Sequence, residues 1–242
     1  MRVCVCISGH FRSFERAYPS LLSNIIRPHS PDVFIYAPSI LGNDGADRGD
    51  KHLLRTTISQ DKLVELYQPK KFIIEPARSW DMSRYKGRIG SGCRNPNMVK
   101  GMFYGIYAAN QLKREYEQAN SFIYDVVIRA RADLFFESSL DRVELENCSN
   151  TGGIYFPKFG SYGGLNDQFA FGNSFSMDVY ADAYNHLDQY FDIGCIWHAE
   201  TLMKASMEHT NTPILRTNIK FYILRANGVK FRLLHDPKQG DV

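Results

Sequence analysis

Hydrophobic positions in this chain recur with a period of two in some segments and with a helical period near 3.6 in others. The period of two predicts strands at residues 2–7, 32–37, 71–75, 126–136, 153–156, 168–172, 221–224 and 230–234. The helical period predicts helices at 15–26, 59–67, 97–118, 174–190 and 198–208. Because strands and helices alternate without an internal repeat or an obvious linker, we expect one α/β domain with a central, mainly parallel mixed sheet flanked by helices.

The segment VVIRARADLFF, residues 126–136, breaks the pattern of a buried strand. One face carries only apolar residues: Val126, Ile128, Ala130, Ala132 and Leu134. The other face carries Arg129, Arg131 and Asp133 after Val127. In an open parallel sheet, the carboxyl ends of the strands form the ligand crevice. We therefore expect the apolar face to pack in the core and the charged face to form the floor of an anion site.

A second polar stretch, SGHFR, follows the first predicted strand. Ser8 and Gly9 permit a tight turn with exposed backbone N–H groups, and the next helix offers its positive N-terminal dipole. His10 and Arg12 add polar and cationic donors. The stretch is interpreted as a nucleotide- or phosphate-binding loop, although it is neither a P-loop nor a GxGxxG fingerprint. The alternative is a plain strand-to-helix turn with surface charges.

A basic loop precedes the helix predicted at 97–118. The segment RYKGRIGSGCRNPNMVK, residues 84–100, holds five basic residues and three glycines and no acid. Such a loop suits a clamp over a diphosphate, with Arg88 as its candidate binding residue. A solvated surface loop is the alternative.

Three further residues are candidates for catalysis or metal binding. Asp133 ends its strand and has the carboxylate chemistry that Mg²⁺ or Mn²⁺ prefers. Asp167 follows a glycine turn at the mouth of the strand predicted at 168–172, where it would accept a proton or serve only as an Asx-turn residue. His235 lies beyond the last predicted strand, as a metal ligand, a phosphate donor or a surface histidine. Glu200 is interpreted as a first-turn acid that the helix dipole favours, and the alternative is that its carboxylate belongs to the functional site.

Composition excludes some classes of function. The 242 residues carry a formal net charge of +3, which is too small for a general nucleic-acid or membrane binder. No apolar run approaches the roughly 20 residues of a transmembrane helix. The five cysteines form no CxxC pair, so we expect free thiols in a reducing, cytoplasmic setting rather than zinc ligation or disulfides.

The order of these motifs resembles glycosyltransferases of the GT-A fold, in particular small polysaccharide- and glycoprotein-building enzymes of bacteria and large algal viruses. The similarity rests on the SGHFR start, the RARAD strand end and the NDQF segment, and it covers most of the chain. It implies a nucleotide-binding half at 1–136 and an acceptor-binding half at 137–242. It also implies a nucleotide-diphosphate sugar as donor, a glycan or glycoprotein as acceptor, and Mn²⁺ or Mg²⁺ as cofactor.

The resemblance assigns a role to each candidate residue. Ser8, Gly9, His10 and Arg12 would contact the nucleotide, with Arg88, Arg129 and Arg131 as further anion-binding residues. Asp133 matches the second acid of the family's DxD motif and His235 its C-terminal metal-binding histidine. Arg131 replaces the first acid of that motif, so its positive charge could act directly in place of a metal. Asp167 matches the acid that activates or orients the acceptor.

Two other functions are compatible with the same residues. A nucleotidyltransferase that makes sugar nucleotides would usually show a glycine-rich GxGxR-type loop followed by lysine, which SGHFRSF fits poorly. A non-catalytic domain would use the arginines to hold an anionic glycan or phosphate. The expected function is nevertheless transfer of a sugar, with a carboxylate opposite the leaving group that suits an inverting displacement.

Overall fold

The computed structural model describes residues 1–41, 56–90, 93 and 95–232 of the chain. The strands are β1 (Val3–Ser8), β2 (Asp32–Pro38), β3 (Lys71–Glu75), β4 (Val126–Ala130), β5 (Leu134–Phe136), β6 (Ile154–Pro157), β7 (Phe169–Gly172), β8 (Ile214–Thr217), β9 (Phe221–Leu224) and β10 (Lys230–Phe231). The α-helices are α1 (Phe14–Leu21), α2 (Arg27–His29), α3 (Gln60–Tyr67), α4 (Pro96–Asn120), α5 (Arg142–Asn150), α6 (Ser174–Asp192) and α7 (Ala199–His209). A π-helical turn, Leu22–Ile26, joins α1 to α2, and a 3₁₀ turn covers Ser83–Tyr85.

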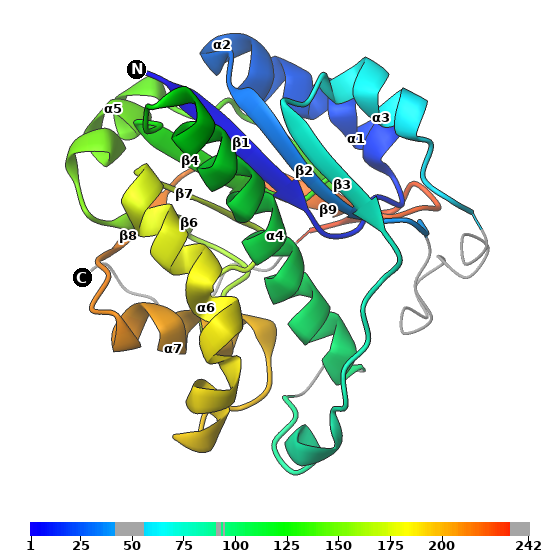
Figure 1. The fold of residues 1–242 in the computed structure, drawn as a ribbon, viewed down its shortest axis with the longest axis vertical. Coiled ribbons are helices and arrows are strands. Elements are labelled where there is room, and N and C mark those ends of the chain that lie inside the picture. Colours follow the sequence, from blue (N-terminus) through cyan, green and yellow to red (C-terminus); the bar gives the residue numbers. More distant parts are fainter. Residues whose placement is uncertain (42–55, 91–92, 94, 233–242) are drawn as a thin grey trace.

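A seven-stranded sheet in the order β3-β2-β1-β4-β7-β6-β8 forms the centre of the molecule (Figure 1). The strands β3, β2, β1 and β4 are mutually parallel. Within this sheet β7 runs antiparallel to its neighbours β4 and β6, and β8 is parallel to β6. The predicted fold class is confirmed: the chain folds as α/β, with a mainly parallel mixed sheet flanked by helices.

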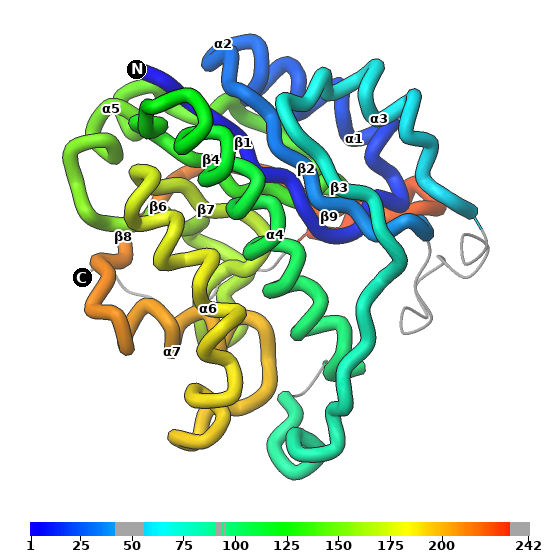
Figure 2. Tube along the Cα trace, in the orientation of Figure 1, coloured from blue at the N-terminus to red at the C-terminus, as the bar shows by residue number. Residues whose placement is uncertain are grey.

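The two faces of the sheet carry separate apolar cores. On one face α4 packs along β1 and β2 and lies beside α6, as Figure 1 shows. On the other face the core includes residues of α1, α3 and α5, together with those of β5 and β9. A small antiparallel sheet in the order β10-β9-β5 adds to this second face. Figure 2 traces the long connection from β3 to the start of α4, which runs past the carboxyl end of the sheet.

The prediction of a single strand at 126–136 is wrong, because the chain passes from the large sheet to the small sheet in the middle of this segment. β4 ends at Ala130, a turn follows, and β5 pairs with β9 in the small sheet. The turn is stabilised by backbone bonds from Arg131 N to Gln168 O (3.2 Å) and from Leu224 N to Asp133 O (2.8 Å). The expected apolar face persists through the turn, since its alternate residues from Val126 to Leu134 lie in one core.

Two elements had no signal in the hydrophobic pattern. α5 buries only Leu145 and Cys148, so it shows no apolar stripe. β8 is an edge strand with three of its four residues half-buried, and edge strands need no clear alternation. The strand predicted at 230–234 is β10 in its first two residues, and 233–234 lie outside the described residues. Among the described residues no helix has the length and apolar character needed to cross a bilayer.

Candidate functional site

The loop after β1 contacts the end of β4, its parallel neighbour. Gly9 directly follows β1 and has φ of 108°, a backbone conformation that residues with a side chain rarely adopt. A Cβ at Gly9 would lie 3.3 Å from Cγ of Arg131. Glycine is therefore required here both for the turn and for the close approach, and it brings the SGHFR loop against the RARAD strand end as the sequence predicts.

Arg12, Arg131 and Asp133 form an ion cluster at this edge of the sheet, called here the arginine–aspartate cluster. Arg131 grips the carboxylate with two bonds, Nε to Oδ1 at 2.9 Å and Nη2 to Oδ2 at 2.6 Å. Arg12 Nη2 donates to the same Oδ2 at 2.8 Å. The Asp133 side chain is 0% exposed and that of Arg131 is 12% exposed, so the cluster is open to solvent through Arg131.

The two arginines set the protonation of their neighbours in the cluster. Burial opposes the ionisation of Asp133, but Arg131 and Arg12 outweigh it and hold the pKa of this carboxyl well below its usual range. Burial, together with the charges of Arg12 and Arg131, lowers the pKa of His10 to about 3, so its imidazole is neutral at pH 7. Within the described residues both guanidinium groups share this one carboxylate, and Asp167 and Glu200 act on Arg131 more weakly. Arg131 is the more exposed of the two arginines, so it is the cation of the cluster that solvent reaches.

A divalent cation does not fit this donor set. Both oxygens of Asp133 already accept N–H bonds, and no group of three or more His, Cys, Asp or Glu side chains suited to a metal occurs within the described residues. Unit charges 4 Å apart interact by about 4 kcal/mol at an effective dielectric constant of about 20, and a divalent cation doubles that repulsion for each nearby guanidinium. The metal role of Asp133 stays a prediction, and the geometry around this carboxylate disfavours it.

Two buried acids and a histidine lie near the cluster and are called here the acid wall: Asp167, Glu200 and His198. His198 Nδ1 lies 2.9 Å from Glu200 Oε2. Burial and the nearby charge of Asp167 raise the pKa of Glu200, whereas the contact with Glu200 raises the pKa of His198. Both shifts favour the protonated forms of the two side chains. The 2.9 Å contact is a close ion pair rather than a well-aligned hydrogen bond, since His198 Nδ1 has no hydrogen-bond partner of good geometry.

Glycines again set the distance between segments at the acid wall. Leu165 N donates to the backbone O of Glu200 at 3.0 Å, which ties the loop before β7 to the first turn of α7. A Cβ at Gly164 would lie 2.0 Å from that same oxygen. A Cβ at Gly90 would lie 2.8 Å from Cβ of His198, so the segment before α4 also packs against the wall.

The arginine–aspartate cluster and the acid wall are adjacent. Gln168, the residue after Asp167, accepts a bond from Arg131 N through its backbone O. The negative charges of Asp167 and Glu200 both act on Arg131, after the larger effect of Asp133. Cationic and acidic side chains thus meet at the carboxyl ends of β1 and β4 and at the start of β7.

Several buried polar atoms at this meeting point have no hydrogen-bond partner. They are Ser8 Oγ, Ser161 Oγ, Asp167 Oδ1 and Gln168 Oε1. A buried polar group left without a partner costs about 1–3 kcal/mol, so native proteins keep few of them. Other such atoms lie elsewhere in the described part of the chain, for example Tyr67 Oη on α3 and Tyr222 Oη on β9. The four atoms therefore mark polar groups here that are open to a hydrogen-bond partner.

The structure brings together most, but not all, of the predicted site residues. Gly9, His10, Arg12, Arg131 and Asp133 lie together, and Asp167 is near enough for its charge to act on Arg131. Ser8 ends β1 directly before Gly9, and a Cβ at Gly105 of α4 would lie 3.4 Å from Ser8 Cβ. His235 lies outside the described residues.

Two predicted anion-binding arginines lie elsewhere. Arg129 points into the core under α4 and α6, where Nη1 donates to Gln168 O at 2.8 Å. Arg88 donates to Phe191 O at 2.6 Å and stacks 4.0 Å over the Phe191 ring, at the end of α6. In this conformation neither guanidinium reaches the arginine–aspartate cluster.

Sequence reasoning missed Arg225 and His198 and gave Glu200 no committed role. The charge of Arg225 acts on His10, because the chain after β9 folds back on the loop after β1: Ser13 Oγ donates to Leu224 O at 2.6 Å. That contact depends on β5 pairing with β9, which no local pattern signals. The signal for the acid wall was the short motif HAE at the start of a predicted helix, whose histidine and glutamate lie 2.9 Å apart in the structure.

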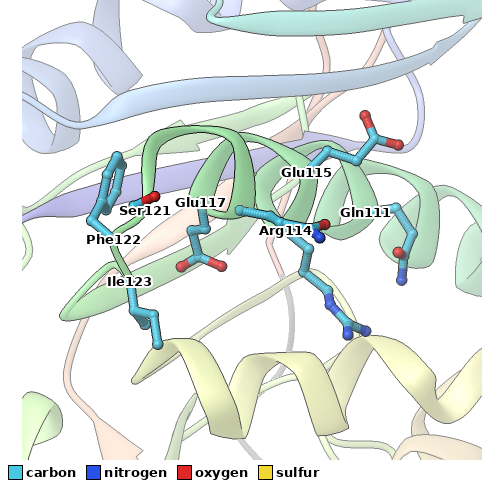
Figure 3. Close-up of a pocket in the computed structure, with 8 residues that line it drawn as sticks. Gln111, Arg114, Glu115, Glu117, Ser121, Phe122 and Ile123 are labelled. Atoms are coloured by element: carbon cyan, nitrogen blue, oxygen red, sulfur yellow. The ribbon is translucent and has the colours of Figure 1, made fainter.

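A separate hollow of about 670 Å³ lies at the C-terminal end of α4, lined by residues such as Arg114, Glu117 and Ile123 (Figure 3). Ile123 precedes β4 by three residues, so the hollow lies at the amino ends of the parallel strands. The arginine–aspartate cluster follows the carboxyl ends. No predicted site residue lines the hollow.

Comparison with known proteins gives a family and a distant structural neighbour. No curated protein matches the sequence. Solved structures include a protein of Desulfovibrio desulfuricans G20, provisionally assigned as a nucleotide-diphospho-sugar transferase. It shares 12% identity, with a TM-score of 0.44, over 90% of this chain and 80% of that chain. The family model that matches residues 1–236 is described as a domain of unknown function, DUF7796. Because the match spans nearly the whole chain, the protein belongs to the DUF7796 family.

Proposed function

We propose that this protein is a glycosyltransferase that moves a sugar from a nucleotide-diphosphate sugar to a hydroxyl of a glycan or glycoprotein. The observation that carries the proposal is the meeting of the arginine–aspartate cluster with the acid wall at the carboxyl edge of one parallel sheet. A sugar transfer needs these two environments side by side, one for a leaving phosphate and one for an attacking hydroxyl.

The arginine–aspartate cluster serves the leaving group. Breaking the sugar–phosphate bond leaves a nucleoside diphosphate whose negative charge must be stabilised as it develops. Arg12 and Arg131 supply fixed positive charge, since Asp133 restrains both guanidinium groups. Ser8 and Gly9 add a hydroxyl and a backbone turn at the end of β1, which suits phosphate oxygens.

The acid wall serves the acceptor. An acceptor hydroxyl loses its proton as it attacks the sugar carbon, and a carboxylate within reach takes that proton. Asp167 has a buried oxygen, Oδ1, with no partner, so one lone-pair direction is open to a hydroxyl. Glu200 and His198 act as positioning residues behind it. A carboxylate across from the leaving group suits an inverting displacement.

The same geometry favours an enzyme over a domain that only holds an anion. A receptor for anions gains nothing from two buried carboxylates near its arginines, because they repel the ligand. Asp167 and Glu200 are both buried at this place, each less than a tenth exposed. The free-energy cost of burying these two acids is explained if one of them accepts or donates a proton during a reaction.

The test is thermal unfolding with UDP, GDP and their sugar conjugates, followed by an assay for release of the nucleoside diphosphate. A ligand at 100 times its dissociation constant adds about 2.7 kcal/mol, which raises the melting temperature by roughly 5–10 °C for a domain of this size. We expect one nucleotide to give such a shift and its sugar conjugate to be turned over slowly by water. A shift with nucleotide but no release of product would favour a binding domain, and no response to any nucleotide would exclude the proposal.

A further inference from the structure

We infer that this site binds the diphosphate of its donor without a divalent cation, and that Asp133 is a positioning residue for two arginines rather than a metal ligand. The inference rests on the proposed function. It concerns the same site and names the chemistry by which the anion is recognised: guanidinium groups in place of a bridging metal.

The first support is the occupancy of the Asp133 carboxylate. Three N–H bonds from Arg12 and Arg131 cover its two oxygens, at 2.6 to 2.9 Å, and the side chain has no exposed surface. A metal ion would have to displace at least one guanidinium and would then face the other. Bidentate guanidinium–carboxylate pairs are among the strong charge-assisted contacts in proteins, so the displacement is unfavourable.

The second support is the way Arg131 is presented. Its Nε and Nη2 bind Asp133, which uses two of the five N–H donors of a guanidinium. Its side chain is 12% exposed, while that of Asp133 is not exposed at all. A ligand that enters the site therefore meets the arginine first and the carboxylate is hidden behind it. In this arrangement the acid fixes the direction in which the guanidinium points.

The third support is the position of the remaining acids. Asp167 and Glu200 lie on the acid wall, and Glu200 is engaged with His198 at 2.9 Å. Ser8 Oγ, buried and without a partner, belongs to the last residue of β1, directly before the Gly9 that approaches Arg131. A hydroxyl donor and two guanidinium groups together can hold phosphate oxygens by hydrogen bonds alone.

The test uses the wild-type protein and needs no variant. UDP and GDP are titrated by calorimetry, once in EDTA and once in saturating Mn²⁺, and Mn²⁺ alone is titrated into the nucleotide-free protein. We expect the nucleotide that binds to do so in EDTA, with an affinity within about threefold of that in Mn²⁺. Binding only in Mn²⁺, or at least tenfold tighter binding in Mn²⁺, would overturn the inference while leaving the proposed function standing. Failure of both nucleotides under both conditions would overturn the proposed function itself.

A matched pair of variants tests the role of the arginine directly. Arg131→Gln should weaken nucleotide binding in EDTA at least tenfold, because it removes the exposed cation of the cluster. Arg142→Gln removes a guanidinium of an exposed pair with Glu146 on α5 and should bind as the wild type does. Equal affinity of Arg131→Gln and wild type would contradict the inference. A melting curve of each variant confirms that it is folded at the temperature of the titration.

Discussion

Arg131 folds back onto Asp133, its second neighbour in the chain, with its Nε and Nη2 on the two carboxylate oxygens at 2.9 and 2.6 Å. In a continuous strand these two residues would lie on one face with their Cα atoms roughly 6.5–7 Å apart. Here the chain turns between β4 and β5 and changes sheets, and the ion pair spans that turn. The turn and the ion pair are thus one feature, and β4 ends where the site begins.

Asp133→Asn should destabilise the protein by about 3 kcal/mol at pH 7, because it leaves buried guanidinium charge without its carboxylate. The folded pKa of Asp133 lies well below its unfolded value of about 3.9, so this contribution is fully present above that value. It is lost as the pH falls further toward the folded pKa. Urea unfolding of wild type and variant should show a constant difference from pH 7 to 5 and a shrinking one below pH 4.

Asp192→Asn is the matched control, since Asp192 forms an exposed pair with Arg84 at 2.6 Å. Exposed pairs contribute about 0–1 kcal/mol, so this variant should unfold nearly as the wild type does. A difference for Asp133→Asn that stays constant down to pH 3 would show that its carboxylate is not held ionised by the arginines.

Asp167→Asn should leave nucleotide binding within a few-fold of wild type and lower the rate of sugar transfer or donor hydrolysis by about 10²- to 10⁴-fold. The amide keeps the size of the side chain but cannot take a proton from the acceptor. Calorimetry with the nucleotide and a product-release assay separate the two effects. Asp182→Asn, on the exposed face of α6, is the control and should keep full turnover. Near-normal turnover of Asp167→Asn would remove this residue from the role of base.

His198 should titrate above pH 6.5 in the folded protein, because its contact with Glu200 favours the protonated ring. A raised folded pKa means that the protonated ring contributes stability below the unfolded value and that the contribution is lost as the pH rises through the folded value. Glu200→Gln removes the main cause, so the pKa of His198 should fall in that variant. Ring signals of His198 followed by NMR from pH 5 to 9 measure both values. An unchanged titration in Glu200→Gln would show that the pair at 2.9 Å is not the source of the shift.

The sequence predicted the part of this site that depends on strand ends. Ser8 to Arg12 and Arg131 to Asp133 follow two strands, and because those strands are parallel neighbours their ends meet. The sequence could not predict which side chains from distant segments would come into contact. Arg129 and Arg131 share one strand face in the sequence, yet the turn after Ala130 sends the first into the core and the second to the edge.

Other parts of the site depend on how distant segments pair. Glu200 reaches Asp167 because the glycine turn before β7 packs on α7, a contact between residues more than thirty positions apart. Arg225 reaches His10 through the pairing of β9 with β5. Periodicity reports which face of an element is buried, and it carries no information on which remote element covers that face.

Gly164→Ala should be the most damaging glycine-to-alanine change among the glycines that the structure describes. Its Cβ would lie 2.0 Å from the backbone O of Glu200 and 2.1 Å from the backbone C, and backbone atoms cannot move aside as a flexible side chain can. Overpacking of this kind costs about 1–3 kcal/mol or more, and relief requires α7 to shift away from the loop before β7. Gly152→Ala is the control, because a Cβ there meets nothing within 4 Å. Urea unfolding should show a loss for Gly164→Ala of at least about 2 kcal/mol more than for the control. The same shift carries Glu200 and His198 away from Asp167, so turnover should fall even at temperatures where the variant is fully folded. Stability and turnover equal to those of Gly152→Ala would mean that the loop and α7 are not in contact in solution.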